Sequence, residues 1–414
     1  MLHTKDLPIS SELLLKLADN FSTPTYAYSE SIIRERCQKL QQLFPGLPVV
    51  WLYAIKANDN PHLLDIIRDE GFGFDTVSYE EVLLAQKIAD EPSAILYTEN
   101  NMTDDEMKAA IDTGVWLNIG SLDRLEILAE RGQKVRCCVR LNLDVGDGHH
   151  ETVNTGHSES KFGITLDKLE ELHRINRETN VTIAGVHTHI GSGIQEPKNL
   201  IRAMNVLLEN TREFKELDFI NFGGGFPIPY EPGEVPFDID EFGEIAAPLL
   251  QNELELREGK IQFWFEPGRW IVGPAGVLLS QVTAVKQQGG ISYLGTNTGF
   301  NHLLRPLLYS AYHEVRNISK PNEETGHKYH ISGNICESGD VLAKNRHLPE
   351  TQTGDILAID DAGAYGMTMS SLYNRRALPL ELLIKSNGNE KVIRPRQSSE
   401  QVVKEYLLKT VHGP

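Results

Sequence analysis

The sequence contains few cysteines, and their positions argue against two kinds of site. Four cysteines occur in 414 residues, at Cys37, Cys137, Cys138 and Cys336. None stands at the short, repeated intervals of a metal-binding motif. Cys137 and Cys138 are adjacent in a strand-like run, where neighbouring side chains point to opposite faces. We therefore expect four free thiols and no bound metal.

Several other features are missing. The sequence has no apolar run long enough to span a membrane, and its first residues, MLHTKDLPISSELL, lack the basic patch and apolar core of a secretory signal. It has no dense stripe of Lys and Arg, and its net charge is −18. Such an acidic chain repels a phosphate backbone. We expect a cytoplasmic globular protein that binds neither a membrane nor nucleic acid.

Strand-like and helical patterns alternate regularly over residues 28–275. Helical patterns such as NPHLLDIIRDE and LDKLEELHRINRE separate runs with the strand pattern. The strand-like runs are VVWLYAIKA, FGFDTVS, AILYT, VWLNIGS, VRCCVRLN, TIAGVHTHIG, FINFGGG and IQFWFEPGR. Eight such pairs predict an α/β fold of the (β/α)8 type, a TIM-like barrel with its active site at the carboxyl ends of the strands.

The alternation stops after residue 275. The following runs VLLSQVTAVKQ, YHISG, DILAID and KVIRP are strand-like, and a chain of 414 residues exceeds the usual size of a single core. We therefore predict a barrel domain over residues 28–275 and a mostly-β domain formed by residues 1–27 and 276–414.

Chemically versatile residues follow the predicted strands where they end. They are Lys56, Asp75, His189, Ser192, Gly223, Gly224, Gly225, Glu266 and Arg269. Each has an ordinary explanation when taken alone: a lysine is usually a solvated surface charge, and consecutive glycines often form a tight turn. Glu266 and Arg269 would make a salt bridge, and a buried histidine is commonly held by a backbone partner. A barrel, however, brings all of these residues to one mouth.

Together these residues suit a cofactor with an aldehyde, a phosphate and a pyridine nitrogen. Lys56 lies among apolar neighbours in YAIKAN, where a desolvated amine with a lowered pKa would form a Schiff base. The N–H groups of Gly223–Gly225 suit a phosphate. Glu266 would keep the ring nitrogen protonated, and His189 would stack on the ring. We therefore predict pyridoxal 5'-phosphate as the cofactor.

Seven motifs resemble the fold-type III pyridoxal-phosphate decarboxylases, the alanine racemase-like barrels. They are YAIKAN, FDTVS, HTHIGSG, FGGGF, EPGR, CESGD and GAYGMTMSSLYN, and their order and spacing match across nearly the whole chain. Within that family, HHETVNTGHSESKFGI, FNHLLRPLLYSAYHEV and VIRPRQSSE resemble the diaminopimelate decarboxylases. The resemblance implies decarboxylation of meso-2,6-diaminopimelate to L-lysine and CO2, a step of lysine biosynthesis.

The resemblance also implies individual roles. Lys56 would be the Schiff-base lysine, Cys336 the proton donor, and His189 a catalytic residue against the ring. Residues implied to bind the cofactor are Lys56, Asp75, His189, Ser192, Gly223, Gly224, Gly225, Glu266 and Tyr365. Residues implied to bind the substrate are Arg269, Arg305, Tyr309, Glu337 and Tyr365. Cys336 and Glu337 reach the site from the neighbouring subunit in this family, which implies a homodimer with shared active sites.

Three positions depart from the family pattern, and several alternatives stay open. Leu372 stands where Asn is expected, Asn297 where Asp is usual, and SYEEV replaces a glycine-containing turn. These departures bear on substrate preference, so a decarboxylase of lysine or ornithine, in the L or D form, is the nearest alternative. A racemase on the same barrel and an inactive relative that regulates a decarboxylase are two others. Cys336 would otherwise be a small buried core residue.

Overall fold

The computed structural model describes residues 9–145 and 160–411, the side chains as far as residue 408. The chain divides into two compact units. The barrel unit comprises Arg34–Ile228 and Val235–Trp270, and the β-rich unit comprises the remaining described residues. Most of the stretch HHETVNTGHSESKFGI, and the start of the N-terminal segment MLHTKDLPISSELL, lie outside the described residues.

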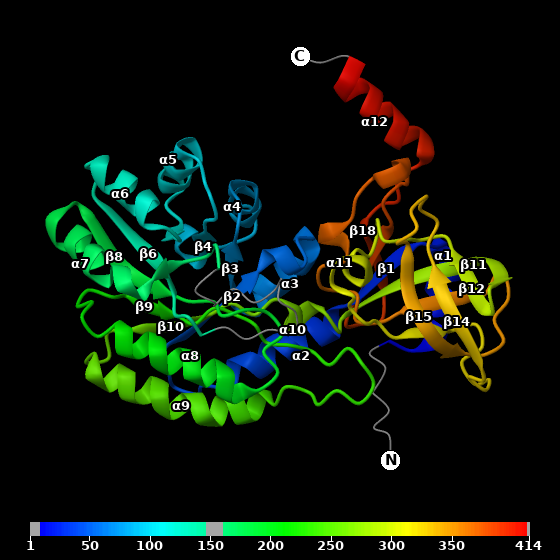
Figure 1. The fold of residues 1–414 in the computed structure, drawn as a ribbon, viewed down its shortest axis with the longest axis horizontal. Coiled ribbons are helices and arrows are strands. Elements are labelled where there is room, and N and C mark those ends of the chain that lie inside the picture. Colours follow the sequence, from blue (N-terminus) through cyan, green and yellow to red (C-terminus); the bar gives the residue numbers. More distant parts are fainter. Residues whose placement is uncertain (1–8, 146–159, 412–414) are drawn as a thin grey trace. The chain divides into compact units, whose positions relative to one another are not determined.

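Eight parallel strands close into a ring in the barrel unit (Figure 1). Their order is β5-β4-β3-β2-β10-β9-β8-β6, and the pairing of β5 with β6 closes the ring. The strands are β2 (Val49–Ala54), β3 (Gly73–Thr76), β4 (Ile95–Thr98), β5 (Trp116–Ile119), β6 (Val135–Asn142), β8 (Val181–His187), β9 (Phe219–Asn221) and β10 (Gln262–Phe265). The short β7 (Ile164–Thr165) pairs with β6 outside the ring. The predicted eight-stranded α/β barrel is confirmed.

Helices alternate with these strands, and local sequence explains where several begin. The helices are α2 (Glu30–Gln41), α3 (Pro61–Asp69), α4 (Tyr79–Ala85), α5 (Asp104–Thr113), α6 (Leu122–Glu130), α7 (Leu169–Glu178), α8 (Pro197–Asn210), α9 (Ile239–Leu256) and α10 (Arg269–Val272), with 3-10 turns η1 (Ile55–Ala57), η2 (Pro92–Ala94) and η4 (Leu166–Lys168). Thr103 and Glu106 form a reciprocal capping box at α5. Ser78 caps α4 by accepting from the Glu81 N–H at 3.2 Å, so the SYEEV segment starts a helix.

The amino ends of the barrel strands enclose an aromatic core. The rings of Phe219 and Trp264 stack with centroids 3.7 Å apart, and Trp116 meets both of them edge-on. Leu52 and Leu96 pack in the same cluster. Large buried rings supply much of the hydrophobic stabilisation of a core. The interior is therefore filled by apolar side chains at this end.

The β-rich unit is built on a nine-stranded, mostly antiparallel sheet. Its strands are β1 (Thr25–Ser29), β11 (Gly276–Gln288), β12 (Ile291–Thr296), β13 (Val315–Asn317), β14 (His327–Ser332), β15 (Val341–Leu348), β16 (Ile356–Ile359), β17 (Leu380–Ile384) and β18 (Glu390–Arg394). Its helices are α1 (Ser11–Phe21), α11 (Arg305–Tyr309) and α12 (Ser399–Val411), with 3-10 turns η5 (Met367–Met369) and η6 (Tyr373–Arg375). The predicted mostly-β region is confirmed.

Helix α1 covers part of this sheet. Ser10 caps it by accepting from the Leu13 N–H at 3.3 Å. Leu14 and Leu17 are fully buried and share a core cluster with Val277 of β11 and Leu382 of β17. An N-terminal helix and strand are thereby joined to the C-terminal sheet.

Two simple expectations can be compared with the structure. All four cysteines are free, as predicted. Among the described residues, no helix combines the length and the apolar character needed to cross a bilayer.

Candidate active site

Lys56 and Asp75 form an ion pair at the carboxyl ends of neighbouring strands. Lys56 lies in η1, directly after β2, and Ala54 pairs with Asp75 across β2 and β3. The Lys56 Nζ donates to Asp75 Oδ2 at 3.0 Å. Burial, followed by the nearby Glu266, raises the pKa of Asp75, while Lys56 lowers it. The ion pair thus favours the charged form of both partners.

The Lys56 side chain is partly exposed, while its ion-pair partner is buried. Its side chain is 39% exposed, whereas that of Asp75 is 1% exposed. The apolar neighbours in YAIKAN belong to the end of β2 and to η1, and Lys56 alone extends toward solvent and a carboxylate. Whether the Lys56 amine has a lowered pKa stays a prediction, and the ion pair with Asp75 favours the ammonium form.

Glu266 follows β10 and is held by two side chains from neighbouring strands. Asn221 Nδ2 donates to Oε1 at 2.7 Å, and His187 Nε2 lies 3.2 Å from Oε2. Burial lowers the pKa of His187 well below its ordinary value, so its ring is neutral and Nε2–H donates to the carboxylate. Burial raises the pKa of Glu266, and Lys56, the bond from Asn221, and Arg140 lower it. The two donors thus orient the Glu266 carboxyl group and favour its charged form, while burial opposes it.

His189 is a neutral ring in a defined tautomer. Its Nδ1 accepts from the Gly224 N–H at 3.2 Å, so the ring proton lies on Nε2. Burial, followed by the positive charge of Arg140, lowers the pKa of His189 well below its usual range. An uncharged aromatic ring suits stacking against a positively charged pyridine.

The glycines after β9 are partly committed to the protein itself. Gly223 N–H donates to Asn221 Oδ1 at 2.8 Å, and Gly224 N–H donates to His189. Two of the three N–H groups thus already have partners within the protein. Cofactor binding by Gly223–Gly225, with Ser192, stays a prediction.

Close packing explains why glycine is required at these positions. A Cβ at Gly224 would lie 2.1 Å from the Glu266 carbonyl oxygen, and one at Gly223 would lie 2.4 Å from that of Thr188. Real Cβ atoms do not approach backbone so closely. The glycines let the end of β9 fit between the ends of β8 and β10, which puts Glu266 and His189 in the same mouth.

Arg269 and Ser192 are also brought together at this end of the barrel. Arg269, the last residue of EPGR, begins α10, and its Nη2 donates to Ser192 Oγ at 3.0 Å. The arginine predicted for the substrate thus contacts the serine predicted for the phosphate.

Three residues in the mouth were not predicted from the sequence. They are Arg140, His187 and Asn221, at the ends of β6, β8 and β9. Arg140 Nη2 lies 3.4 Å from the His189 carbonyl oxygen, and His187 and Asn221 hold Glu266. A signal was present, because each is a polar residue at or near the carboxyl end of a barrel strand, where a barrel places its chemistry.

Arg305 and Tyr309 belong to the β-rich unit, at the two ends of α11. Arg305 is 6% exposed and Tyr309 is half-buried. Helix α11 lies against the turn between β14 and β15, because a Cβ at Gly339 would be 2.8 Å from Leu307 Cδ1. The same turn carries Cys336 and Glu337, so four predicted site residues lie in one part of this unit.

Cys336 and Glu337 are exposed in that turn. The Cys336 N–H donates to Asn374 Oδ1 at 2.8 Å. The alternative of a small buried core residue is therefore wrong for Cys336. Tyr365 lies in a separate turn after β16, half-buried and with a positive φ of 56°.

The departures at Asn297 and Leu372 have different outcomes. Asn297 Oδ1 accepts from Ser280 Oγ and the Gln281 N–H, while its Nδ2 donates to Thr23 Oγ1 at 2.8 Å. Aspartate could keep a bond to Thr23 only by accepting from its hydroxyl, since a carboxylate has no donor. Asn297 therefore ties the N-terminal segment to β11. Nothing in the structure explains Leu372.

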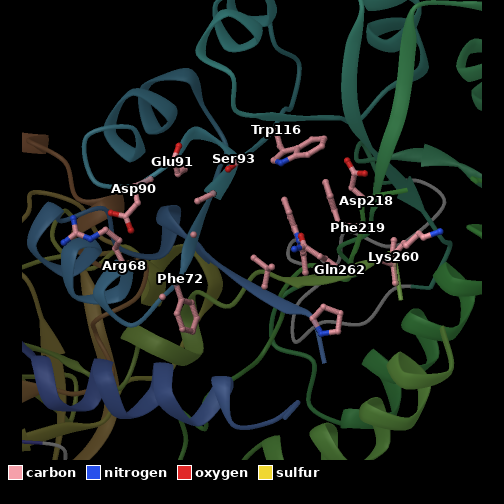
Figure 2. Close-up of a pocket in the computed structure, with 18 of the residues that line it drawn as sticks. Arg68, Phe72, Asp90, Glu91, Ser93, Trp116, Asp218, Phe219, Lys260 and Gln262 are labelled. Atoms are coloured by element: carbon pink, nitrogen blue, oxygen red, sulfur yellow. The ribbon is translucent and has the colours of Figure 1, made fainter. Parts of the chain in front are cut away.

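The opposite end of the barrel has a hollow of a different character (Figure 2). It is a cavity of about 870 Å³ at the amino ends of the strands. Aromatic residues such as Trp116 and Phe219 line it with scattered charges that include Arg68 and Asp90. None of the predicted site residues lines this cavity.

The residues at the carboxyl ends fit pyridoxal phosphate. Lys56 supplies the amine, Glu266 is a carboxylate held by two donors, and His189 is a neutral ring. Two buried acceptor atoms in the same mouth, Asp75 Oδ1 and His187 Nδ1, have no hydrogen-bond partner among the described residues. The fold and this set of groups define a pyridoxal-phosphate-dependent barrel enzyme.

Comparisons with known proteins give the family. Residues 30–273 match the family described as pyridoxal-dependent decarboxylase, pyridoxal binding domain. The diaminopimelate decarboxylase of Methanothermobacter thermautotrophicus is 39% identical over 399 residues, which is 94% of this chain and 93% of the relative. A solved diaminopimelate decarboxylase superposes with a TM-score of 0.88 at 31% identity, covering 98% of this chain and 99% of the other. That of Helicobacter pylori, complexed with L-lysine, has a TM-score of 0.87 at 28% identity over 95% and 99% of the two chains. The chain therefore belongs to the pyridoxal-dependent decarboxylases and, within them, to the diaminopimelate decarboxylase family.

Proposed function

We propose that this chain decarboxylates meso-2,6-diaminopimelate to L-lysine and CO2 with pyridoxal 5'-phosphate. The observation that carries the proposal is the extent of the similarity to a named diaminopimelate decarboxylase, 94% of this chain. A likeness confined to the barrel would suit any decarboxylase of this fold. This one also runs through the β-rich unit, which contains most of the residues predicted to contact the substrate.

The barrel residues divide the cofactor chemistry among themselves. When bound, pyridoxal phosphate takes up the electron pair that departing CO2 leaves behind. Lys56 provides the amine that attaches the cofactor, and Asp75 holds that amine at 3.0 Å. Glu266 would keep the ring nitrogen protonated, and His187 and Asn221 orient its carboxyl group by donating to it. His189 would stack on the ring.

The remaining groups bind the substrate and complete the reaction. Arg269, Arg305 and Tyr309 would donate to the distal carboxylate, and Glu337 would accept from the distal amine. Arg305 is buried, so a carboxylate there meets little competition from water, and paired charged hydrogen bonds are strong. Cys336 would return a proton to the carbon that has lost CO2, and its exposed position suits a group that acts on a substrate.

Substrate choice tests this function directly. Purified protein with pyridoxal phosphate is assayed for CO2 release from meso-diaminopimelate, lysine and ornithine. Lysine and ornithine lack the distal carboxylate, so diaminopimelate should be preferred by on the order of a hundredfold. Arg305→Ala should remove most of this preference while leaving the absorbance of bound cofactor unchanged. Equal turnover of lysine or ornithine by the wild type would show that the distal clamp is misassigned.

A homodimer with shared sites is part of the same proposal. Cys336 and Glu337 would then act in the site of the partner subunit. Lys56→Ala and Cys336→Ala should each be inactive alone and should regain activity when mixed, because one site of the mixed dimer keeps both groups. No recovery after verified subunit exchange would mean that each site is built from one chain. The cytoplasmic location expected from the sequence also belongs to this proposal.

A further inference from the structure

A buried histidine stands directly behind Arg305 in the β-rich unit. His313 is 0% exposed and lies between β13 and the end of α11. Its Nε2 is 2.8 Å from Arg305 Nη1, and its Nδ1 is 2.8 Å from the carbonyl oxygen of Asp360. Nε2 therefore lies beside a hydrogen-bond donor, and Nδ1 lies beside an acceptor.

These two contacts determine where the ring proton lies. A carbonyl oxygen only accepts, so Nδ1 must carry the hydrogen. A guanidinium only donates, so Nε2 must present its lone pair to Arg305. Only the neutral tautomer with Nδ1–H satisfies both bonds, since a charged imidazolium would aim an N–H at a cation. Arg305 thus has an acceptor in a fixed direction.

An aromatic ring holds the guanidinium in a second direction. Arg305 Cζ lies 4.3 Å from the centroid of Tyr230. The rings of Tyr230 and His313 meet edge-to-face, with centroids 5.4 Å apart and planes at 73°. One ring therefore lies beneath the guanidinium and the other meets its edge. A flexible side chain held in both ways loses most of its rotational freedom.

The acceptor that orients His313 is itself anchored. The Asp360 N–H donates to the Glu314 carbonyl oxygen at 2.9 Å. Its carboxylate receives Arg316 Nε and Nη2 at 2.7 and 2.9 Å. Arg346 Nη2 also donates to the backbone carbonyl oxygen of His313 at 3.2 Å. His313 is thus held through both its side chain and its backbone, and it cannot turn away from Arg305 without breaking this network.

We propose that His313 is a positioning residue that sets the direction in which Arg305 meets the distal carboxylate of the substrate, and that it thereby determines substrate preference. The inference rests on the proposed function and deepens it. A paired contact between guanidinium and carboxylate requires the two planes to be aligned. His313 need not touch the substrate, because it supplies the alignment through Arg305.

Two substitutions separate this role from simple packing. In His313→Gln the amide oxygen reaches the position of Nε2 and still accepts from Arg305. In His313→Asn the shorter amide reaches only the position of Nδ1, so it keeps the bond to Asp360 and loses the one to Arg305. We expect kcat/KM for meso-diaminopimelate to fall on the order of tenfold or more in His313→Asn, mainly through KM. It should stay near the wild-type value in His313→Gln.

The control substrate and folding measurements make the test specific. Lysine has no distal carboxylate, so its slow turnover should be the same in both variants and in the wild type. The absorbance of bound cofactor and the thermal midpoint report whether each variant is folded. If His313→Asn does not fold, Tyr230→Leu takes its place, because it removes the other contact that orients Arg305 and should lower the same preference.

The outcomes distinguish this inference from the function on which it rests. If His313→Asn is folded and keeps the wild-type preference for diaminopimelate, while Arg305→Ala loses it, the inference fails and the proposed function stands. If His313→Gln loses the preference as fully as His313→Asn, the residue acts by packing and the inference also fails. If Arg305→Ala keeps the preference, the distal clamp itself is wrong.

Discussion

The two ends of the barrel are built from the same strands and have opposite characters. At the amino ends, the rings of Trp116, Phe219 and Trp264 stack or meet edge-on. Figure 2 labels Trp116 and Phe219 among the residues that line the cavity there. At the carboxyl ends, the same strands lead to Lys56, Asp75 and Glu266, a group of charges that includes two buried carboxylates. None of the residues predicted to bind the cofactor or the substrate lines the cavity at the amino ends.

This difference shows how a barrel separates stability from function. Apolar rings at one end remove large areas from water and stabilise the fold. Buried carboxylates at the other end cost stability unless they are paired, and their raised pKa values reflect that cost. Mutations at the two ends should therefore affect different measurements.

The largest effect should come from the lysine at the carboxyl end. Lys56→Ala should lower CO2 release by on the order of a thousandfold or more, because Lys56 is the amine proposed to attach the cofactor. Lys56→Arg should be equally inactive, since it keeps a charge beside Asp75 but not the amine. Lys260→Ala, at the amino end and 78% exposed, is the matched control and should be fully active.

Borohydride reduction gives an independent measurement for the same prediction. It should fix the cofactor covalently to the wild type and to Lys260→Ala but not to Lys56→Ala. Covalent attachment in Lys56→Ala would identify a different lysine as the attachment site.

At the amino end, the largest effect should be on stability. Trp264→Ala removes a ring stacked at 3.7 Å on Phe219 and should reduce the free energy of unfolding by about 3–5 kcal/mol. Denaturant unfolding measures this loss, and the activity per folded molecule should be nearly unchanged. Gln262→Ala, which removes only an exposed partner of the indole N–H, should cost less than about 1 kcal/mol. Loss of cofactor binding with unchanged stability in Trp264→Ala would contradict the separation of the two ends.

Glu81, beside the mouth, should have a smaller effect on stability, and this effect should depend on pH. Burial raises the pKa of Glu81 from its usual 4.5 to about 7, although its Oε2 accepts from the Val77 N–H. The folded protein therefore holds a proton that the unfolded chain releases, so stability contributed by this group falls as pH rises from about 4.5 to about 7.

Glu81→Gln provides the test, because the amide keeps the acceptor for Val77 and does not titrate. The variant should gain stability relative to the wild type as pH rises through this range, and by less than the Trp264 effect. Thermal midpoints measured across the range check the sign. A difference that is constant with pH would show that Glu81 titrates normally.

Much of the candidate site could be predicted from the sequence. Strand and helix patterns are local, and a barrel places every strand end at the same mouth. Lys56, Asp75, His189 and Glu266 were therefore predicted together, and the structure brings them together. The role of each stays a prediction, but their proximity follows from alternation alone.

Details that depend on contacts between distant segments could not be predicted from the sequence. The sequence suggested a phosphate cradle at Gly223–Gly225, yet two of these N–H groups bond to Asn221 and His189. The sequence placed Lys56 and Asp75 at the same mouth but did not show that they form an ion pair across 19 residues of the chain. Which donor meets which acceptor depends on register between strands, and composition carries no information about register.

The sequence by itself determined the alternation that forms the barrel, the strand-rich second region, and the positions where chemistry gathers, because side-chain periodicity is a property of neighbouring residues. Only the tertiary structure decided the protonation and orientation of the groups. The neutral His187 that holds Glu266 and the His313 tautomer that faces Arg305 depend on burial and on partners 79 and 47 residues away in the chain. Hydrogen-bond direction and desolvation arise between segments, so they exist only once the chain has folded.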